Sequence, residues 1–359
     1  MRRALAPLLL ALAPVLSAGR AAAQDTATAV LRDVRFATGE ALPEVRLHYW
    51  TMGRARRGAS GAVTNAVLLL HGTTGTGRQF LNPIFAGEMF APGQPLDTTI
   101  FYVVAPDNVG HGRSSKPSDG LRARFPRYTY DDMVDLQRRL LREALGVDHL
   151  LLVLGTSMGC MHAWVWGTRY PGEADGLVPL ACAPAQIAGR NRMLRRMILD
   201  DIRTDPLYAG GDYAQQPRGL AAALQVLYLM SSAPLVQQRE APTRDSADAV
   251  WARWLAARLP TYDANDVVYA FDASRDYDPS ARLGAITSRV LSINSADDLI
   301  NPPELGLAER LVRGVPRGRF VLIPISERTR GHGTHTAAAV WKPWVGPFIR
   351  GLASERGLP

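Results

Sequence analysis

The run LLLVLGTSMGCMHAWVWG, residues 150–167, decides the fold. Its first five residues are continuously apolar, as is typical of a strand buried on both faces of a parallel sheet. Gly155, Ser157 and Gly159 then form a Gly-x-Ser-x-Gly pattern, and an apolar and aromatic run follows to Gly167 within a helical pattern that ends at about Tyr170. The stretch therefore predicts a buried strand, a tight turn that exposes a serine, and a helix.

Ser157 is a candidate nucleophile because of the turn that carries it. A glycine on each side avoids the collision that a Cβ atom would cause in a strained strand-to-helix turn. The amide of Met158 opens the following helix, whose positive end faces a developing oxyanion. We therefore expect Ser157 to attack a carbonyl carbon, with the Met158 amide as one oxyanion donor.

The partners of such a serine should follow in the order acid, then histidine, each after a later strand. The stretch VLSINSADDLINPPEL supplies Asp297 and Asp298, and FVLIPISERTRGHGTHT supplies His332 and His335. Successive residues on an extended segment face opposite ways, so we expect one aspartate to face the histidine and the other to cap the loop. We favour His332, which follows Gly331 and leaves more loop before the last helix, with His335 at the helix start or in the pocket.

The second oxyanion donor should come from the glycine-rich loop HGTTGTG, residues 71–77, and we choose the amide of Thr73. This loop lacks the Gly-Lys-Ser/Thr ending of a phosphate-binding loop. His71 comes too early in the chain for the expected order and is interpreted as a residue that fixes the loop. No cluster of His, Cys and Glu has metal-ligand spacing, so we expect no metal and no other cofactor.

Strand patterns alternate with helical ones along most of the chain, which predicts a mostly parallel, doubly wound α/β sheet. Strand patterns before and after the opening stretch occupy residues 66–72, 99–107, 176–184, 288–295 and 318–326, and the last helix spans about 336–352. From 185 to 283 the strand pattern stops and helical pieces follow. We therefore expect a core formed by residues 24–184 and 284–359, with residues 185–283 inserted as a helical cap.

Residues 1–23 have the pattern of a signal peptide: a basic start, a short apolar run with two prolines, and an Ala-x-Ala site. We expect a periplasmic or secreted protein with no stable membrane span after cleavage. Cleavage would remove three of the 41 bases and none of the 33 acids, which lowers the formal charge from +8 to +5. This dilute excess without a basic-aromatic run predicts no nucleic-acid binding.

Two cysteines, Cys160 and Cys182, are too few for a disulfide scaffold. Each lies in an apolar run, so we expect small buried side chains. A disulfide between them stays an open alternative, because an oxidising compartment would permit it. The sequence is compatible with a monomer and with a homodimer.

Several further stretches carry a family resemblance: LDTTIFYVVAPDNVG, FPRYTYDDMVDLQ, GTSMGCMHAWVWGTRYP, DPLYAGGDYAQQPRGLAAA and DDLINPPEL. With them the chain resembles α/β-hydrolase-fold proteins of the homoserine O-acetyltransferase-like group over most of its mature length. The family's Asp-x-x-x-Pro-Pro pattern selects Asp298 as the catalytic acid, and its Gly-His pair selects His332. The resemblance thus implies a triad of Ser157, Asp298 and His332.

The chain departs from this family where it has DNVGHGRSSKP in place of an Asn-x-x-Gly-Gly-Cys segment, and Gly333 where aspartate usually follows the histidine. The implied cap arginine for a homoserine carboxylate is not singled out among Arg190, Arg192, Arg195 and Arg196. Export would also separate the enzyme from acetyl-CoA. We therefore expect an exported serine hydrolase for a small-molecule ester or related acyl substrate. An acyl-CoA-dependent O-acyltransferase and a non-catalytic binding protein are the alternatives.

Overall fold

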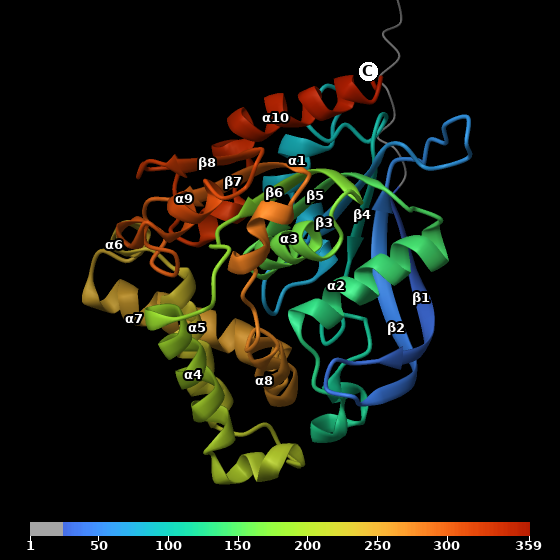
Figure 1. Ribbon diagram of the computed structural model, residues 1–359. Helices are drawn as coiled ribbons and strands as arrows, with labels where there is room; N and C mark the ends of the chain where they lie inside the picture. Colours follow the sequence, from blue (N-terminus) through green and yellow to red (C-terminus); the bar gives the residue numbers. More distant parts are fainter. Residues whose placement is uncertain (1–23) are drawn as a thin grey trace, which may run out of the picture.

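The computed structural model describes residues 24–359, so the predicted signal segment lies outside the described residues. One sheet has the strand order β1-β2-β4-β3-β5-β6-β7-β8 (Figure 1). The strands are β1 (Gln24–Arg35), β2 (Ala41–Met52), β3 (Ala66–Leu70), β4 (Tyr102–Pro106), β5 (Leu150–Thr156), β6 (Ala174–Leu180), β7 (Arg289–Ser295) and β8 (Gly318–Ile323). The β1–β2 hairpin and the β2–β4 pair are antiparallel, and all pairings from β4 to β8 are parallel.

Helices cover both faces of the sheet (Figure 1). On one face α2 (Tyr130–Arg139) and α3 (Met158–Arg169) pack in a core cluster with the strands, and α9 (Leu307–Val312) joins them beside β8. On the other face α1 (Pro83–Met89) and α10 (Ala338–Glu355) build the second cluster around Phe85 and Trp341. These layers confirm the expected α/β-hydrolase fold, because the continuous apolar strands are buried on both sides.

The segment between β6 and β7 is helical, and we call it the cap. Its helices are α4 (Gly189–Arg203), α5 (Gly219–Ser231), α6 (Pro234–Glu240), α7 (Arg244–Arg258) and α8 (Ala264–Asp272). Ile198, Leu220 and Phe271 belong to a separate apolar cluster within this segment. No single helix of the described residues is long and apolar enough to cross a membrane, and α5 and α6 pass that test only as a pair bent by 104°.

One expectation from the sequence differs from the structure, and one question that the sequence left open is answered. The predicted strand 176–184 ends at Leu180, because Ala181 has a left-handed backbone with φ 67° that turns the chain out of the sheet. Cys160 and Cys182 are not free thiols but form a disulfide, with Cα atoms 5.9 Å apart. Both side chains are fully buried, as expected, and the disulfide that the sequence left open is the state in the structure.

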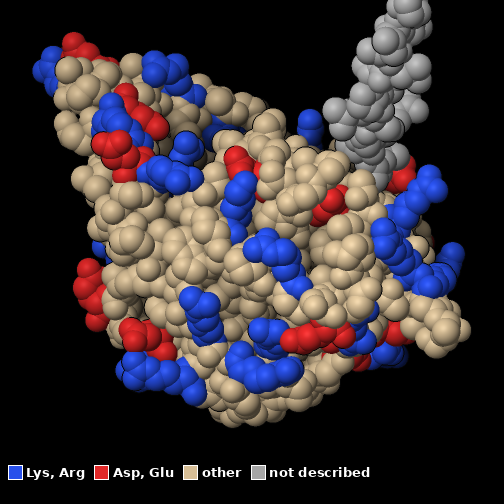
Figure 2. Space-filling view, turned by 90° about the horizontal axis from the view of Figure 1, so that it is seen from above, with Lys and Arg blue, Asp and Glu red and all other residues tan. Residues whose placement is uncertain are grey.

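Charged side chains are dispersed over the surface. On the face that carries α10, Lys and Arg side chains are separated by acidic and uncharged residues (Figure 2). Many of the arginines on the described surface are paired, as Arg169 is with Asp135 and Arg289 with Glu355. The described residues also include no group of three His, Cys, Asp or Glu side chains placed to hold a metal ion.

Candidate active site

The turn between β5 and α3 holds Ser157 in a strained conformation, with φ 55° and ψ −110°. A Cβ on Gly155 would lie 1.9 Å from the carbonyl oxygen of Gly159, and one on Gly159 would lie 2.0 Å from that of Leu70. Both glycines of the motif are therefore required by close backbone approach. The Ser157 amide donates to the Leu180 carbonyl at 2.9 Å, which ties the turn to β6.

Three side chains from separate loops meet at this turn. His332 Nε2 lies 2.8 Å from Ser157 Oγ, and His332 Nδ1 lies 2.9 Å from Asp298 Oδ2. Asp298 follows β7 and His332 follows β8, so the parallel sheet brings them to the same edge as the turn after β5. In this arrangement Nδ1–H donates to the carboxylate and Nε2 accepts from the serine hydroxyl, the geometry that a general base requires.

Asp298 is buried and kept ionised by its partners. Burial alone would raise its pKa, but the charge and hydrogen bond of His332, together with donors from Asn301 and Ile300, outweigh burial and lower the pKa below its ordinary value. Asn301 Nδ2 donates to Asp298 Oδ2 at 3.0 Å and to the Ala181 carbonyl at 3.1 Å. A carboxylate held in this way can stabilise an imidazolium during the reaction.

The neighbouring carboxylate, that of Asp297, does not bind the ring of His332 but the loop that carries it. Asp297 accepts a hydrogen bond at 2.8 Å from the amide of Gly331, the residue before His332, and another from the hydroxyl of Ser295. The structure thus brings Asp298 to the histidine and places Asp297 against the loop that carries it.

His335 lies beside the site, but its ring is not hydrogen-bonded to Ser157, His332 or Asp298. Its ring is 5.1 Å from that of His332, between centroids, and its Nδ1 has no hydrogen-bond partner among the described residues. Burial, with the nearby His332, lowers the pKa of His335 to about 3. A neutral ring that faces His332 edge-on is a wall of the site rather than a base for Ser157.

Of the two predicted oxyanion donors, Thr73 lines the cavity that contains Ser157, and Met158 follows Ser157 directly in the chain. Met158 is the first residue of α3, so its amide has no acceptor within the helix. Thr73 lies with Gly72 and Thr74 in the wall of the cavity that contains Ser157. A Cβ on Gly72 would lie 3.3 Å from that of Ser157, which shows how closely this loop approaches the nucleophile. The oxyanion role of both amides stays a prediction.

His71 holds the loop that carries Thr73. Its Nδ1 donates to the Gly72 carbonyl at 2.8 Å, and its Nε2 accepts from the backbone amide of Asn108 at 3.0 Å. Burial lowers the pKa of His71 to about 4, against the opposing Gly72 hydrogen bond, so the ring stays neutral. The side chain therefore fixes the loop, in keeping with the interpretation from the sequence.

A cavity of about 320 Å³ lies above Ser157, between the carboxyl edge of the sheet and the cap. The cap contributes apolar and aromatic side chains to its wall: Leu227, Met230, Trp254, Tyr262 and Phe271. No local pattern in the sequence marks these residues, because their approach to the sheet depends on how the cap helices pack.

Of the four cap arginines that the sequence offered for a homoserine carboxylate, Arg195 lines this cavity. It is only 2% exposed, its Nε donates to Asn191 and its Nη1 to Ser274, and its guanidinium lies 5.5 Å from the centre of the Phe271 ring. No carboxylate of the described residues pairs with it, whereas Arg196 is exposed and bound to Asp200. The guanidinium of Arg195 in the cavity wall is therefore not paired with a carboxylate of the described residues.

Comparisons with known proteins agree with this geometry. A family model described as alpha/beta hydrolase fold matches residues 65–324. A homoserine O-acetyltransferase of Clavibacter michiganensis subsp. michiganensis is 30% identical, over 84% of this chain and 87% of that protein. A probable acyltransferase of Methanothermobacter thermautotrophicus is 28% identical, over 81% of this chain and 88% of that protein.

Solved structures share the fold at lower sequence identity. Homoserine O-acetyltransferase from Bacillus anthracis superposes with a TM-score of 0.79 at 19% identity, covering 91% of this chain and 97% of the other. An acetylester hydrolase from Corynebacterium glutamicum gives 0.77 at 19% identity, covering 93% and 96%. The chain belongs to the α/β-hydrolase fold family and resembles its homoserine O-acetyltransferase-like members.

Proposed function

We propose that this protein hydrolyses small-molecule esters or related acyl substrates through an acyl-Ser157 intermediate. The observation that carries the proposal is the unbroken series from Ser157 Oγ to His332 and Asp298 at the floor of a cavity. His332 takes the hydroxyl proton as Ser157 Oγ bonds to the carbonyl carbon, and returns it to the alcohol as the ester bond breaks. Water then attacks the acyl-enzyme with His332 again as base, releasing the acid and restoring Ser157.

Water is proposed as the acyl acceptor for two reasons from the sequence. The Gly-His-Gly-x-Ser segment at 110–114 is typical of hydrolases rather than of the acetyltransferases. Residues 1–23 also predict export to a compartment that lacks a supply of acyl-CoA. We propose a periplasmic or secreted location on the second ground, and fractionation of cells that express the chain with and without residues 1–23 tests it.

Acyl transfer is the second candidate, and Arg195 is the observation that favours it. A buried guanidinium with no carboxylate partner suits an acceptor that carries a carboxylate, and two of the relatives reported above are named as acyltransferases. Such an enzyme would have to hold the acceptor hydroxyl at the acyl-enzyme and exclude water.

One experiment separates these readings. The purified protein is incubated with short acyl esters, with and without acetyl-CoA plus homoserine or serine, and free acids and O-acyl products are both quantified. Hydrolysis that is abolished in Ser157→Ala and unaffected by CoA supports the proposal. CoA-dependent O-acylation faster than hydrolysis, with a KM for the acceptor that rises in Arg195→Met, supports transfer instead. Biological activity that persists in Ser157→Ala points to a binding protein.

A further inference from the structure

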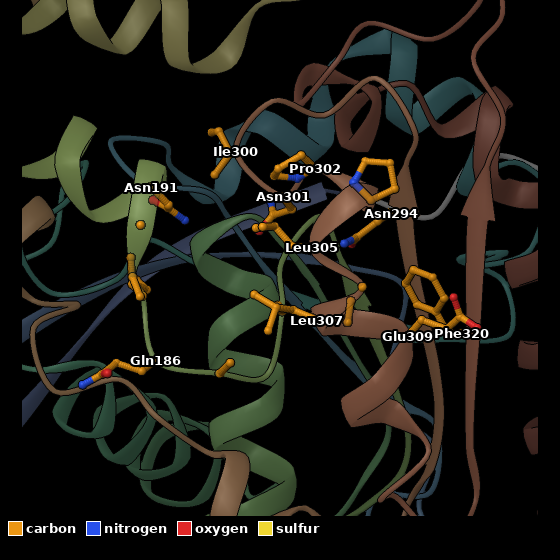
Figure 3. A pocket seen from close by; sticks show the side chains of 18 of the residues that line it. Gln186, Asn191, Asn294, Ile300, Asn301, Pro302, Leu305, Leu307, Glu309 and Phe320 are labelled. Carbon is orange, nitrogen blue, oxygen red and sulfur yellow. The ribbon is translucent and has the colours of Figure 1, made fainter.

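A second cavity, of about 260 Å³, lies next to the one that contains Ser157. It is formed by the segment that leads from β6 into the cap, around Ala185 and Ile187, and by the loop and helix after β7, around Pro302 and Leu307 (Figure 3). Phe320 of β8 also lines this cavity. We call this second cavity the apolar cleft.

The apolar cleft adjoins the catalytic cavity through one layer of side chains. Met161, Ile300 and Asn301 line both spaces. Met161 is one helical turn after Ser157 on α3 and is 4% exposed, and Ile300 is two residues after Asp298 and is 8% exposed. Asn301 is fixed by its hydrogen bonds, whereas the unbranched Met161 side chain can change rotamer to join the two spaces.

The surface of the cleft suits a hydrocarbon chain. Most lining side chains are apolar, and Leu305 at its open end is 55% exposed. Asn191 and Glu309, two of its polar residues, already bond to Arg195 and Arg313. Asn294 is different, since its buried Oδ1 has no partner among the described residues and leaves one acceptor at the inner wall.

The open mouth of the catalytic cavity has another character. Arg258 and Thr336 line the cavity and are exposed, Tyr262 lines it and is partly exposed, and their guanidinium and hydroxyl groups suit water and a polar alcohol. After acylation the alcohol leaves and water enters, while the acyl group stays on Ser157. The polar mouth therefore serves the groups that exchange, and the apolar cleft serves the group that remains attached.

We infer that the apolar cleft is the binding site for the acyl chain of the substrate, so that the enzyme prefers medium-chain acyl esters to acetyl esters. The inference rests on the proposed ester hydrolysis at Ser157. A cavity of about 150 Å³ accepts benzene, with six carbons, so one of 260 Å³ has room for about ten. The alkyl chain passes Met161 and Ile300 and ends near Leu305.

The test compares p-nitrophenyl acetate with p-nitrophenyl octanoate in three proteins. We expect the kcat/KM of the wild type to be at least tenfold higher for octanoate. Leu305→Asp places a charge at the exposed end of the cleft, and we expect it to lower kcat/KM for octanoate about tenfold and that for acetate less than twofold. Leu235→Asp is the matched control, because Leu235 is 61% exposed and lines neither cavity, and it should change neither value.

A second measurement does not depend on turnover. Octanoate binding to Ser157→Ala is followed by calorimetry, and Leu305→Asp in that background should weaken it about tenfold while Leu235→Asp leaves it unchanged. Equal octanoate and acetate rates, with binding insensitive to Leu305→Asp, would overturn the cleft assignment and leave ester hydrolysis standing. A preference for alkyl acetates with long alcohols would place the alcohol in the cleft and also overturn it. Octanoate binding without turnover of any ester would overturn the proposed function alone.

Discussion

Replacing Asp298 with asparagine should lower kcat about 10⁴-fold and change KM little. Asp298 Oδ1 accepts from the backbone amides of Ile300 and Asn301 at 2.8 and 3.3 Å, and Oδ2 faces His332 Nδ1 and the side chain of Asn301. An asparagine at this position accepts both backbone hydrogen bonds only if its amide oxygen takes the place of Oδ1, which puts its NH₂ group in the place of Oδ2. That NH₂ then donates to His332 Nδ1, which moves the ring proton to Nε2, facing Ser157.

A histidine in that tautomer cannot accept the proton of the serine hydroxyl. The flipped amide, with its oxygen toward His332, would place an NH₂ group against two backbone donors and leave them without an acceptor. Each such buried, unsatisfied amide costs about 1–3 kcal/mol. The inactive tautomer is therefore the stable one, and a 10⁴-fold loss corresponds to about 5 kcal/mol of transition-state stabilisation.

Asp297→Asn is the matched control one residue earlier. Its oxygen can still accept from the Gly331 amide and its NH₂ can donate to Ser295, so we expect a loss of kcat of less than about tenfold. Steady-state kinetics with a p-nitrophenyl ester at pH 8, with thermal melts to verify folding, measure both variants. Near-normal kcat in Asp298→Asn, or a larger loss in Asp297→Asn, would refute the assignment of the two carboxylates.

Two predictions concern stability and are measured by urea unfolding. The Cys160–Cys182 disulfide closes a chain separation of 22 residues, so reducing it, or replacing both cysteines with alanine, should lower the free energy of unfolding by about 3 kcal/mol, and reductant should not affect the double variant. A double variant as stable as the oxidised protein would contradict this. Burial raises the pKa of the Asp266 carboxyl from 3.8 to about 6. Protonation of this carboxyl in the folded protein therefore contributes to the free energy of unfolding below pH 4, and this contribution is lost as the pH rises through 6. The free energy of unfolding of Asp266→Asn, relative to that of the wild type, should therefore rise by about 3 kcal/mol from pH 4 to pH 8. A difference that does not depend on pH would contradict the burial of this carboxyl.

The core and the serine turn were predictable from the sequence because local patterns determine them. The continuous apolar runs at β3, β4 and β5 mark strands buried on both faces, and the two glycines around Ser157 mark a turn that only they permit. A parallel sheet brings successive strand ends to one edge, so an acid and a histidine that follow two later strands, Asp298 and His332, could be expected beside Ser157.

The cap side of the site was not predictable in the same way. Trp254 and Tyr262 line the cavity only because α7 and the turn after it fold over the sheet, and no local pattern records that approach. Arg195 did carry a signal: it precedes Leu199 and Ile202 at helical spacing, and all three are buried. The Cys160–Cys182 bridge depends on how α3 packs beside the end of β6, which residue spacing does not determine.

Covalent labelling of Ser157 tests the central claim most directly. The wild type is treated with a fluorophosphonate, and intact mass and peptide mapping locate the adduct. We predict one adduct at Ser157, no adduct in Ser157→Ala, strongly slowed labelling in His332→Ala, and nearly normal labelling in His335→Ala. Labelling at another residue, or labelling that survives in His332→Ala but is lost in His335→Ala, would contradict the assignment of Ser157 and His332 as nucleophile and base.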